Sequence, residues 1–237
     1  MIEGIVFDWG GTLTRPIEVI YEIDTWGEVA RHLAPDNHEE LVTRLGAIEA
    51  ELWEISRTTQ RSARIEDLVA AVVKEFGIDI AEESLEYATG RHLETLLPHI
   101  EHDPDAVEVL TGLRERGLRI GLLSNTLWPG SFHERLLEEA GIRDLIDARL
   151  YTSQMEVTKP HPDAFKAALG ALRIEDPAAA IFVGDRPYDD IHGAQRAGLR
   201  TIHRPNELVP AHDIAPDAVI DDLSALLVVV DGWMRTS

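Results

Sequence analysis

The second half of the chain alternates regularly between short apolar segments and longer segments with apolar residues on one helical face. Three of the amphipathic segments end at a glycine, namely Gly117, Gly141 and Gly198, and a short apolar run follows each of them. Strands that alternate with helices pair in parallel and are covered on both faces, so we predict an α/β fold with a doubly wound parallel sheet. The predicted helices are Asp105–Arg116, Phe132–Ala140, Pro162–Leu172, Asp189–Ala197 and Leu223–Met234, and the predicted strands are Arg119–Ser124, Ala148–Tyr151, Ala179–Val183, Leu199–His203 and Ala218–Ile220.

The first half of the chain differs, because one predicted strand at residues 2–7 is followed by a long segment without strand patterns. Within that segment the apolar residues recur at helical spacing. We therefore predict a small all-helical cap domain, residues 15–98, inserted into an α/β core formed by residues 1–14 and 99–237. The helices predicted within the cap are Glu18–Leu33, Glu39–Arg57, Ile65–Phe76 and Glu82–Leu97.

The formal net charge of −21 restricts the partners of this chain. Such an acidic surface repels phosphate backbones, so we expect no nucleic-acid partner, and any phosphate site needs a local cation such as Mg²⁺ or a positioned lysine. We expect no membrane span and no signal peptide, because the sequence has neither a long apolar run nor a basic N-terminal region. The absence of cysteine excludes disulfides and fits a cytoplasmic protein. The oligomeric state stays open.

A carboxylate stands at the end of the first predicted strand. Asp8 follows the apolar run there and precedes Gly10 and Gly11. A carboxylate at the C-terminal end of a central parallel strand lies where open α/β sheets bind ligands. Glycines let the backbone approach a ligand closely and expose N–H groups to it. Because aspartate is also a covalent nucleophile toward phosphoryl groups, we predict Asp8 as the nucleophile, with a turn-capping role as the alternative.

Three further polar loops lie next to predicted strands or helices. In a parallel sheet the strand ends face one crevice, so we expect these loops to gather around the first one. Turn residues, a solvated lysine and acids at a helix N-terminus are the structural alternatives for them. The residues concerned are Ser124 and Asn125 after one strand, Lys159 before a helix, and Asp185, Asp189 and Asp190 after another strand.

Together these motifs resemble the haloacid dehalogenase (HAD) superfamily of hydrolases over essentially the whole chain. The resemblance rests on Phe-Asp-x-x-Gly-Thr-Leu near the N-terminus and Leu-Leu-Ser-Asn-Thr mid-chain, then Lys-Pro-x-Pro-x-x-Phe and Val-Gly-Asp-x-x-x-x-Asp-Ile-x-Gly-Ala. Four motifs in the family's order are far more specific than one aspartate after a strand. The resemblance implies a Rossmann-like core with a helical cap, and a phosphatase that acts on a small phosphorylated substrate.

The family resemblance also implies a mechanism. Asp8 would attack phosphorus to form an aspartyl-phosphate, which water then cleaves. Ser124, Lys159 and the backbone N–H groups near Gly11 and Asn125 would hold the phosphoryl oxygens.

The resemblance further implies Mg²⁺ as cofactor, held mainly by oxygen ligands. Asp190 would hold the water ligands of the metal or orient Lys159, and Asp189 is the alternative for that role. The implied metal set is Asp8, the backbone carbonyl of Gly10, Asp185 and Asp190.

One position departs from the family pattern. Phosphatases of this superfamily usually carry a second aspartate two residues after the nucleophile, which protonates the leaving group, and this chain has Gly10 there. General acid–base catalysis contributes about 10²–10⁴ in rate, so its loss matters. Another group could supply the proton, the substrate could have a good leaving group, or the protein could be a weakly active HAD-fold protein that binds a ligand or partner. The candidates for a replacement acid in the predicted cap are Glu18, Glu22, Asp24 and His32.

Three other functions are alternatives to that of a phosphatase. A phosphonatase-like hydrolase also lacks the second aspartate but needs a Schiff-base lysine in the cap, where Lys74 lies on a polar helix face. Haloacid dehalogenases work without a metal and lack the metal-binding aspartate found here at Asp185. A phosphoacceptor signalling domain has no cap after its first strand.

The substrate is not readable from the sequence. Specificity should reside in residues 15–98, where Arg15, Arg57, Arg61 and Arg64 could meet a second anionic group of the substrate, although solvated helix faces are the simpler interpretation.

Overall fold

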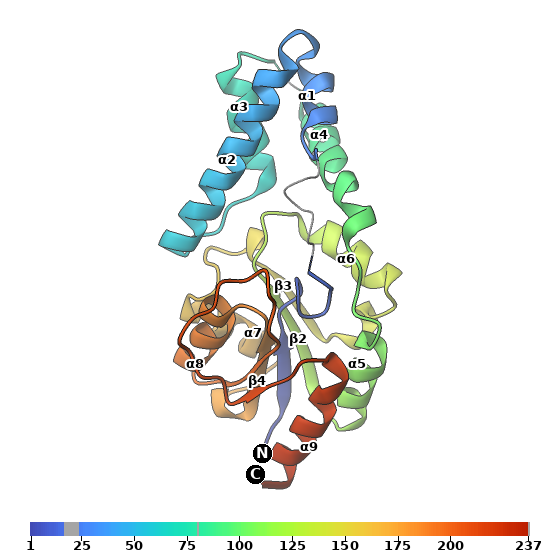
Figure 1. Cartoon of the computed structure of the whole chain (residues 1–237), viewed down its shortest axis with the longest axis vertical. Helices are drawn as coiled ribbons and strands as arrows, with labels where there is room; N and C mark the ends of the chain where they lie inside the picture. The colour runs from blue at the N-terminus through green and yellow to red at the C-terminus, as the bar shows by residue number, and fades with distance from the viewer. Residues whose placement is uncertain (17–23, 80, 237) are drawn as a thin grey trace.

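The computed structural model describes residues 1–16, 24–79 and 81–236, which form a helical part above an α/β part (Figure 1). The strands form a six-stranded sheet in the order β3-β2-β1-β4-β5-β6, and every neighbouring pair is parallel. The predicted α/β class with a doubly wound parallel sheet is thereby confirmed. The strands are β1 (Gly4–Phe7), β2 (Arg119–Ser124), β3 (Ala148–Tyr151), β4 (Ala180–Gly184), β5 (Arg200–His203) and β6 (Ala218–Val219).

Strand β1 lies at the centre because its residues are apolar on both faces. All four of its residues are buried, and Ile5 pairs with Ile120 of β2 on one side and with Ile181 of β4 on the other. A strand that is buried on both faces reads as a continuous apolar run, as this one does. Its carboxyl end therefore opens in the middle of the sheet edge, where loops from its neighbours converge.

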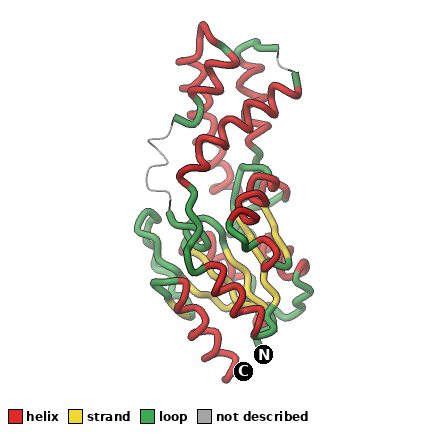
Figure 2. Tube along the Cα trace, turned by 90° about the vertical axis from the view of Figure 1, so that its right-hand side faces the viewer, coloured by secondary structure: helices red, strands yellow, loops and turns green. Residues whose placement is uncertain are grey.

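Helices cover both faces of the sheet, as Figures 1 and 2 show from two directions. Helices α5, α6 and α9 contribute to one apolar cluster, whereas α7 and α8 contribute to a second cluster on the opposite face. The observed bounds agree with the predicted helices, except that a wide helical turn at residues 187–192 precedes the short α8. These helices are α5 (Ala106–Glu115), α6 (Gly130–Glu139), α7 (Pro162–Ala171), α8 (Gly193–Arg196) and α9 (Leu226–Thr236).

The helical part has a core of its own. Apolar residues of its four helices form a third cluster, in which Leu41, Leu45 and Val69 are fully buried. Of the predicted helix Glu18–Leu33, residues 18–23 lie outside the described residues, and the helix observed there begins at Gly27. The four helices are α1 (Gly27–Leu33), α2 (His38–Thr59), α3 (Ile65–Glu75) and α4 (Glu82–Leu96).

Short backbone pairings lie where the helical part meets the α/β part. Thr14 and His102, both in the α/β part, form an antiparallel bridge where the chain leaves this part and returns to it. Arg61 of the helical part bridges Val157 in the loop that leads to Lys159. The predicted division at residues 15 and 98 stays a prediction, and the crossing at Thr14 and His102 supports it. We call the helical part the cap and the α/β part the core.

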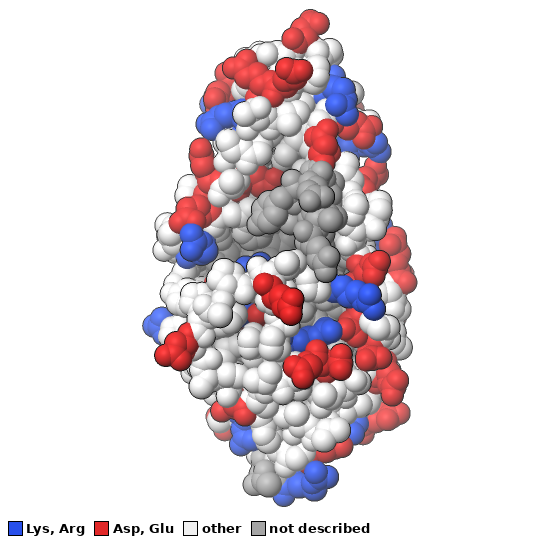
Figure 3. All heavy atoms as spheres, in the orientation of Figure 1, with Lys and Arg blue, Asp and Glu red and all other residues white. Residues whose placement is uncertain are grey.

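Charged side chains of both signs are interspersed over the cap and the core on the face drawn in Figure 3. The acidic side chains visible on this face are therefore not gathered in one patch. None of the helices in residues 1–16, 24–79 and 81–236 combines the length and the apolar character needed to cross a membrane.

Candidate active site

The candidate active site begins where β1 ends. The Asp8 N–H donates to Val183 O of β4 at 2.9 Å, so the hydrogen-bond ladder continues to the nucleophile candidate itself. Directly after it, the N–H groups of Leu13 and Thr14 both donate to Trp9 O, at 2.9 and 3.0 Å, which closes a tight turn. The apolar strand thus fixes Asp8 at the sheet edge, and the turn carries the chain away from it toward the cap.

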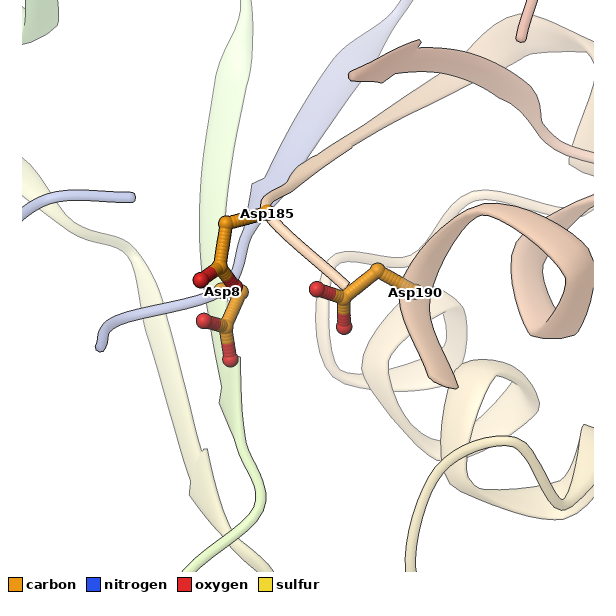
Figure 4. A group of neighbouring side chains, drawn as sticks. All are labelled: Asp8, Asp185 and Asp190. Atoms are coloured by element: carbon orange, nitrogen blue, oxygen red, sulfur yellow. The ribbon is translucent and has the colours of Figure 1, made fainter. Parts of the chain in front are cut away.

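Three buried carboxylates meet at this edge. One oxygen each from Asp8, Asp185 and Asp190 lies within 4.8 Å of the others, and Figure 4 shows these side chains converging from separate segments. Their residues are 6%, 1% and 0% exposed, respectively. Asp185 follows β4 directly, whereas Asp190 is turned toward the strand ends by the wide turn at residues 187–192. The loop after β4, which was predicted to converge on Asp8, therefore does so.

Lys159 partly neutralises this acidic group. Its Nζ lies 2.7 Å from Asp8 Oδ1 and 2.7 Å from Asp190 Oδ1, and its side chain is 1% exposed. Asn125 holds the lysine through its backbone, since Asn125 Nδ2 donates to Lys159 O and Lys159 N donates to Asn125 Oδ1, both at 2.9 Å. The lysine is therefore fixed in place by the loop after β2. Of the neighbouring acids Asp189 and Asp190, it is Asp190 that bonds to Lys159. Because the lysine side chain is buried, the alternative of a solvated surface lysine is excluded.

Burial dominates the electrostatics of these groups. Burial raises the pKa of Asp8 from 3.8 to about 6, although the adjacent Lys159 opposes the rise. Burial and the nearby Asp8 raise the pKa of Asp185 from 3.8 to about 7. Burial disfavours the charged form of Lys159, but Asp190 and Asp8 outweigh it and raise the pKa of that ammonium. An ammonium between two carboxylates compensates only part of the negative charge, and within residues 1–16, 24–79 and 81–236 Asp185 forms no ion pair with a lysine.

The residues present fit a divalent cation. Asp185 Oδ1 is buried and has no hydrogen-bond partner among the residues that the structure describes, whereas Asp185 Oδ2 accepts a hydrogen bond from Asn206. A buried carboxylate oxygen without a partner is costly unless a ligand satisfies it. Several carboxylate oxygens that converge on one point are the donor set that Mg²⁺ prefers. The residues that could hold such an ion are Asp8, Asp185 and Asp190, together with the backbone carbonyl of Gly10.

The two glycines of the first loop have different surroundings. Gly10 is exposed, and a Cβ built on it would meet no atom of the described residues within 4 Å. Gly11 has a φ of 77°, and a Cβ there would overlap Asp185 Oδ2. The Gly11 N–H donates to Thr14 Oγ1 at 3.1 Å, so this group is engaged within the turn. Its predicted contact with a phosphoryl oxygen remains a prediction, and Gly11 has a steric role that sequence reasoning did not anticipate.

Ser124 lies on the same edge. It is the last residue of β2, it is 3% exposed, and its neighbour in register on β3 is Tyr151. Of the four candidates for a replacement acid, the structure describes two, and both have contacts within the cap. Glu18 and Glu22 lie outside the described residues, Asp24 Oδ1 accepts from the Gly27 N–H at 2.7 Å, and His32 packs on Tyr87 of the cap.

The loop after β5 was not singled out by the sequence, although it supports the site. Asn206 Nδ2 donates to Asp185 Oδ2 at 2.7 Å, and Arg204 Nη1 donates to Thr12 O at 2.6 Å. Arg204 also pairs with Asp103, a buried residue beside the crossing between core and cap. Only the position of this loop could have predicted its role, because β5 neighbours β4 and ends at the same edge of the sheet as Asp8 and Asp185.

Comparisons with known proteins identify the family of this chain. A family model described as haloacid dehalogenase-like hydrolase matches residues 2–198. A glyceraldehyde 3-phosphate phosphatase of Pyrococcus abyssi is 36% identical over 108 residues, which cover 46% of this chain and 44% of that protein. The chain spans about half the length of the first curated relatives it matches.

Two solved structures cover nearly the whole chain. A 2-haloacid dehalogenase from Pseudomonas syringae pv. Tomato DC3000 matches with a TM-score of 0.71 and 26% identity, covering 98% of this chain and 100% of that chain. A HAD phosphatase from Thermococcus onnurineus has the same fold, with a TM-score of 0.67 and 21% identity, covering 98% and 99% of the two chains. With the family model matching most of its length, the chain belongs to the haloacid dehalogenase-like hydrolases.

Proposed function

We propose that this hydrolase is a Mg²⁺-dependent phosphatase that acts on a small organic phosphate through an aspartyl-phosphate. The observation that carries the proposal is the pairing of Asp8 with Lys159 beside the unpartnered Asp185 Oδ1. With a pKa raised to about 6 by burial, Asp8 is largely ionised at neutral pH and able to act as a nucleophile. The phosphatases among its relatives agree with this chemistry.

The proposed reaction has two steps. A carboxylate oxygen of Asp8 attacks phosphorus while the bond from phosphorus to the leaving oxygen breaks, and the electron pair leaves with that oxygen. Water then attacks the phosphorus of the aspartyl-phosphate, which releases inorganic phosphate and returns the Asp8 carboxylate. Lys159 and Ser124 would neutralise and orient the phosphoryl oxygens from fixed positions.

The proposed cation would be held by Asp8, the Gly10 carbonyl and Asp185, with Asp190 supporting it and fixing Lys159. When bound, a divalent cation supplies positive charge to the phosphoryl group and offsets the three buried carboxylates. Because Gly10 supplies no acid, we propose substrates whose leaving group needs little protonation, such as acyl or aryl phosphates.

A 2-haloacid is the second candidate substrate. A halide leaves with its electron pair and needs no proton, so the glycine at position 10 would cost nothing, and one similar structure is a 2-haloacid dehalogenase. The unpartnered oxygen of buried Asp185 argues for the phosphatase, since displacement of a halide does not call for a cation there. A phosphonatase-like role is disfavoured by Lys74. Helix α3 meets the core at Ile65, whose N–H donates to Leu127 O. Lys74 is exposed and lies nine residues further along α3, which is about 13 Å from Ile65.

The test is hydrolysis of an aryl phosphate with Mg²⁺, with EDTA, and by the Asp8→Asn variant. We expect turnover with Mg²⁺ and none in the other two conditions. Asp163→Asn is the matched control, because that carboxylate is 59% exposed and pairs with Lys166 on the surface. Turnover that resists EDTA would contradict the proposal. Chloride released from 2-chloropropionate in EDTA, without phosphatase activity, would establish the second candidate instead.

A further inference from the structure

The loop after β5 reaches the site from the side of Asp185. His203 Nε2 lies 3.1 Å from the backbone oxygen of Asp185, and the Arg204 N–H donates to Gly184 O at 3.0 Å. These contacts attach the loop to the end of β4, so the next side chains are presented to Asp185 itself. The loop belongs to no motif on which the family resemblance rests.

Asn206 is held at both ends of its side-chain amide. Its Oδ1 accepts from the Leu208 N–H at 3.0 Å, and its Nδ2 donates to Asp185 Oδ2 at 2.7 Å. The backbone N–H of Leu208 can only donate, which fixes the amide oxygen on that side and the amide nitrogen toward Asp185. These two hydrogen bonds therefore define which side of the amide carries the oxygen and which carries the nitrogen.

The hydrogen bond from Asn206 gives the two carboxylate oxygens of Asp185 different surroundings. Oδ2 is occupied by Asn206, while Oδ1 is buried without a partner. Gly11 makes the arrangement sterically possible, since a Cβ there would overlap Asp185 Oδ2 and lie 2.9 Å from Asn206 Nδ2. The bond to Asn206 therefore restricts rotation of the carboxylate and reserves Oδ1 for another ligand.

We propose that Asn206 is a positioning residue for the cation site, which fixes the Asp185 carboxylate so that Oδ1 remains available to a divalent cation. The proposal rests on the proposed function, because it concerns the cation site named there. Partners that orient a metal-binding carboxylate typically contribute about 10- to 100-fold to metal affinity. A purely structural role at the Leu208 turn would leave metal affinity unchanged.

The test is titration of the metal-free protein with Mg²⁺ alone by calorimetry, without substrate. Asn206→Ser is the variant of choice, because a serine hydroxyl can accept the Leu208 N–H two residues on but is too short to reach Asp185. We expect its Kd for Mg²⁺ to rise about 10- to 100-fold. Leu208→Ala is the matched control in the same loop, since that side chain is 56% exposed, and its Kd should not change.

A second measurement keeps the test decisive. The melting temperature of Asn206→Ser without metal should fall modestly, because buried Asp185 Oδ2 loses its donor, and its rise on adding Mg²⁺ should be smaller than that of the wild type. Should the serine variant fail to fold, Asn206→Ala takes its place. Wild-type affinity for Mg²⁺ in the folded variant would overturn the role of Asn206 and leave the proposed function standing. No Mg²⁺ binding by the wild type would overturn the cation site and this proposal together.

Discussion

The same ion-pair chemistry occurs in the core and in the cap, but in opposite environments. In the core, the side chains of Lys159 and Asp190 are 1% and 0% exposed. In the cap, Arg44 and Glu75 pair between α2 and α3 with 34% and 50% of their side chains exposed. Buried charges are costly to assemble and sensitive to the loss of a partner, whereas exposed pairs contribute little. The comparison indicates that assembling the charged site lowers the stability of the core, whereas the exposed pair of the cap has little effect on stability.

The largest effect should come from adding one carboxylate to each region. Gly10→Asp restores an acid where the family usually has one, and its Cβ would meet nothing within 4 Å. We expect turnover of alkyl phosphates, whose leaving group needs a proton, to rise about 10²–10⁴-fold, and that of aryl phosphates to rise much less. The measurement is kcat/KM for matched alkyl and aryl phosphates.

Gly46→Asp is the matched control in the cap. Gly46 lies in α2, and a Cβ there would also meet nothing within 4 Å, so the same substitution fits without touching the core. Its kcat/KM should remain that of the wild type. An equal gain for both phosphate classes in Gly10→Asp would refute the view that the missing proton limits the reaction.

Removing one cation from each region should give the next largest effect. Lys159→Met leaves the buried carboxylates of Asp8 and Asp190 without their shared partner, and we expect the free energy of unfolding to fall by about 3–5 kcal/mol. Lys74→Met removes an exposed cation from the cap and should change it by less than about 0.5 kcal/mol. Chemical denaturation at pH 8 in EDTA measures both. Equal losses in the two variants would break the comparison.

The third prediction concerns pH. The pKa of Asp185 is raised in the folded protein to about 7 by burial and Asp8, so between about pH 4 and 7 the folded state holds a proton that the unfolded chain has lost. Metal-free stability therefore falls as pH rises through this window. Asp185→Asn stays neutral, and at pH 8 it should be more stable than the wild type by on the order of a few kcal/mol.

This difference in stability should shrink toward pH 4, and Mg²⁺ should stabilise the wild type but not the variant.

Two buried histidines change stability with pH in the opposite direction. Burial lowers the pKa of His92 in the cap to about 4 and that of His133 in the core to about 3, so both cost stability below about pH 6.5. Comparing the two proteins at each pH cancels this contribution. A variant no more stable than the wild type at pH 8 would contradict the cost assigned to the Asp185 charge.

Most of the core could be predicted because each buried strand is a run of apolar residues that ends in a polar motif. Asp8 and Asp185 were found this way, and the structure brings them together with Lys159, which was found in a motif before a helix. Asn206 was missed, because a lone asparagine in a loop carries no pattern and its function depends on a neighbouring strand far away in sequence. The N–H of Gly11 is engaged within its own turn, which depends on a φ of 77° that no spacing reveals.

The smallest effect should come from the cap pair itself. Arg44 Nε lies 3.0 Å from both carboxylate oxygens of Glu75, a favourable geometry, yet water reaches both side chains. A double-mutant cycle with Arg44→Ala and Glu75→Ala should give a coupling free energy of about 0.2–1 kcal/mol, which falls as salt is raised toward 1 M. The same cycle with Lys159→Met and Asp190→Asn should give a larger coupling free energy that salt hardly changes. Each single variant leaves one buried charge without its partner, whereas the double variant removes both charges. If the two couplings were of similar size and similar salt dependence, burial would not be what distinguishes the charged site from the surface of the cap.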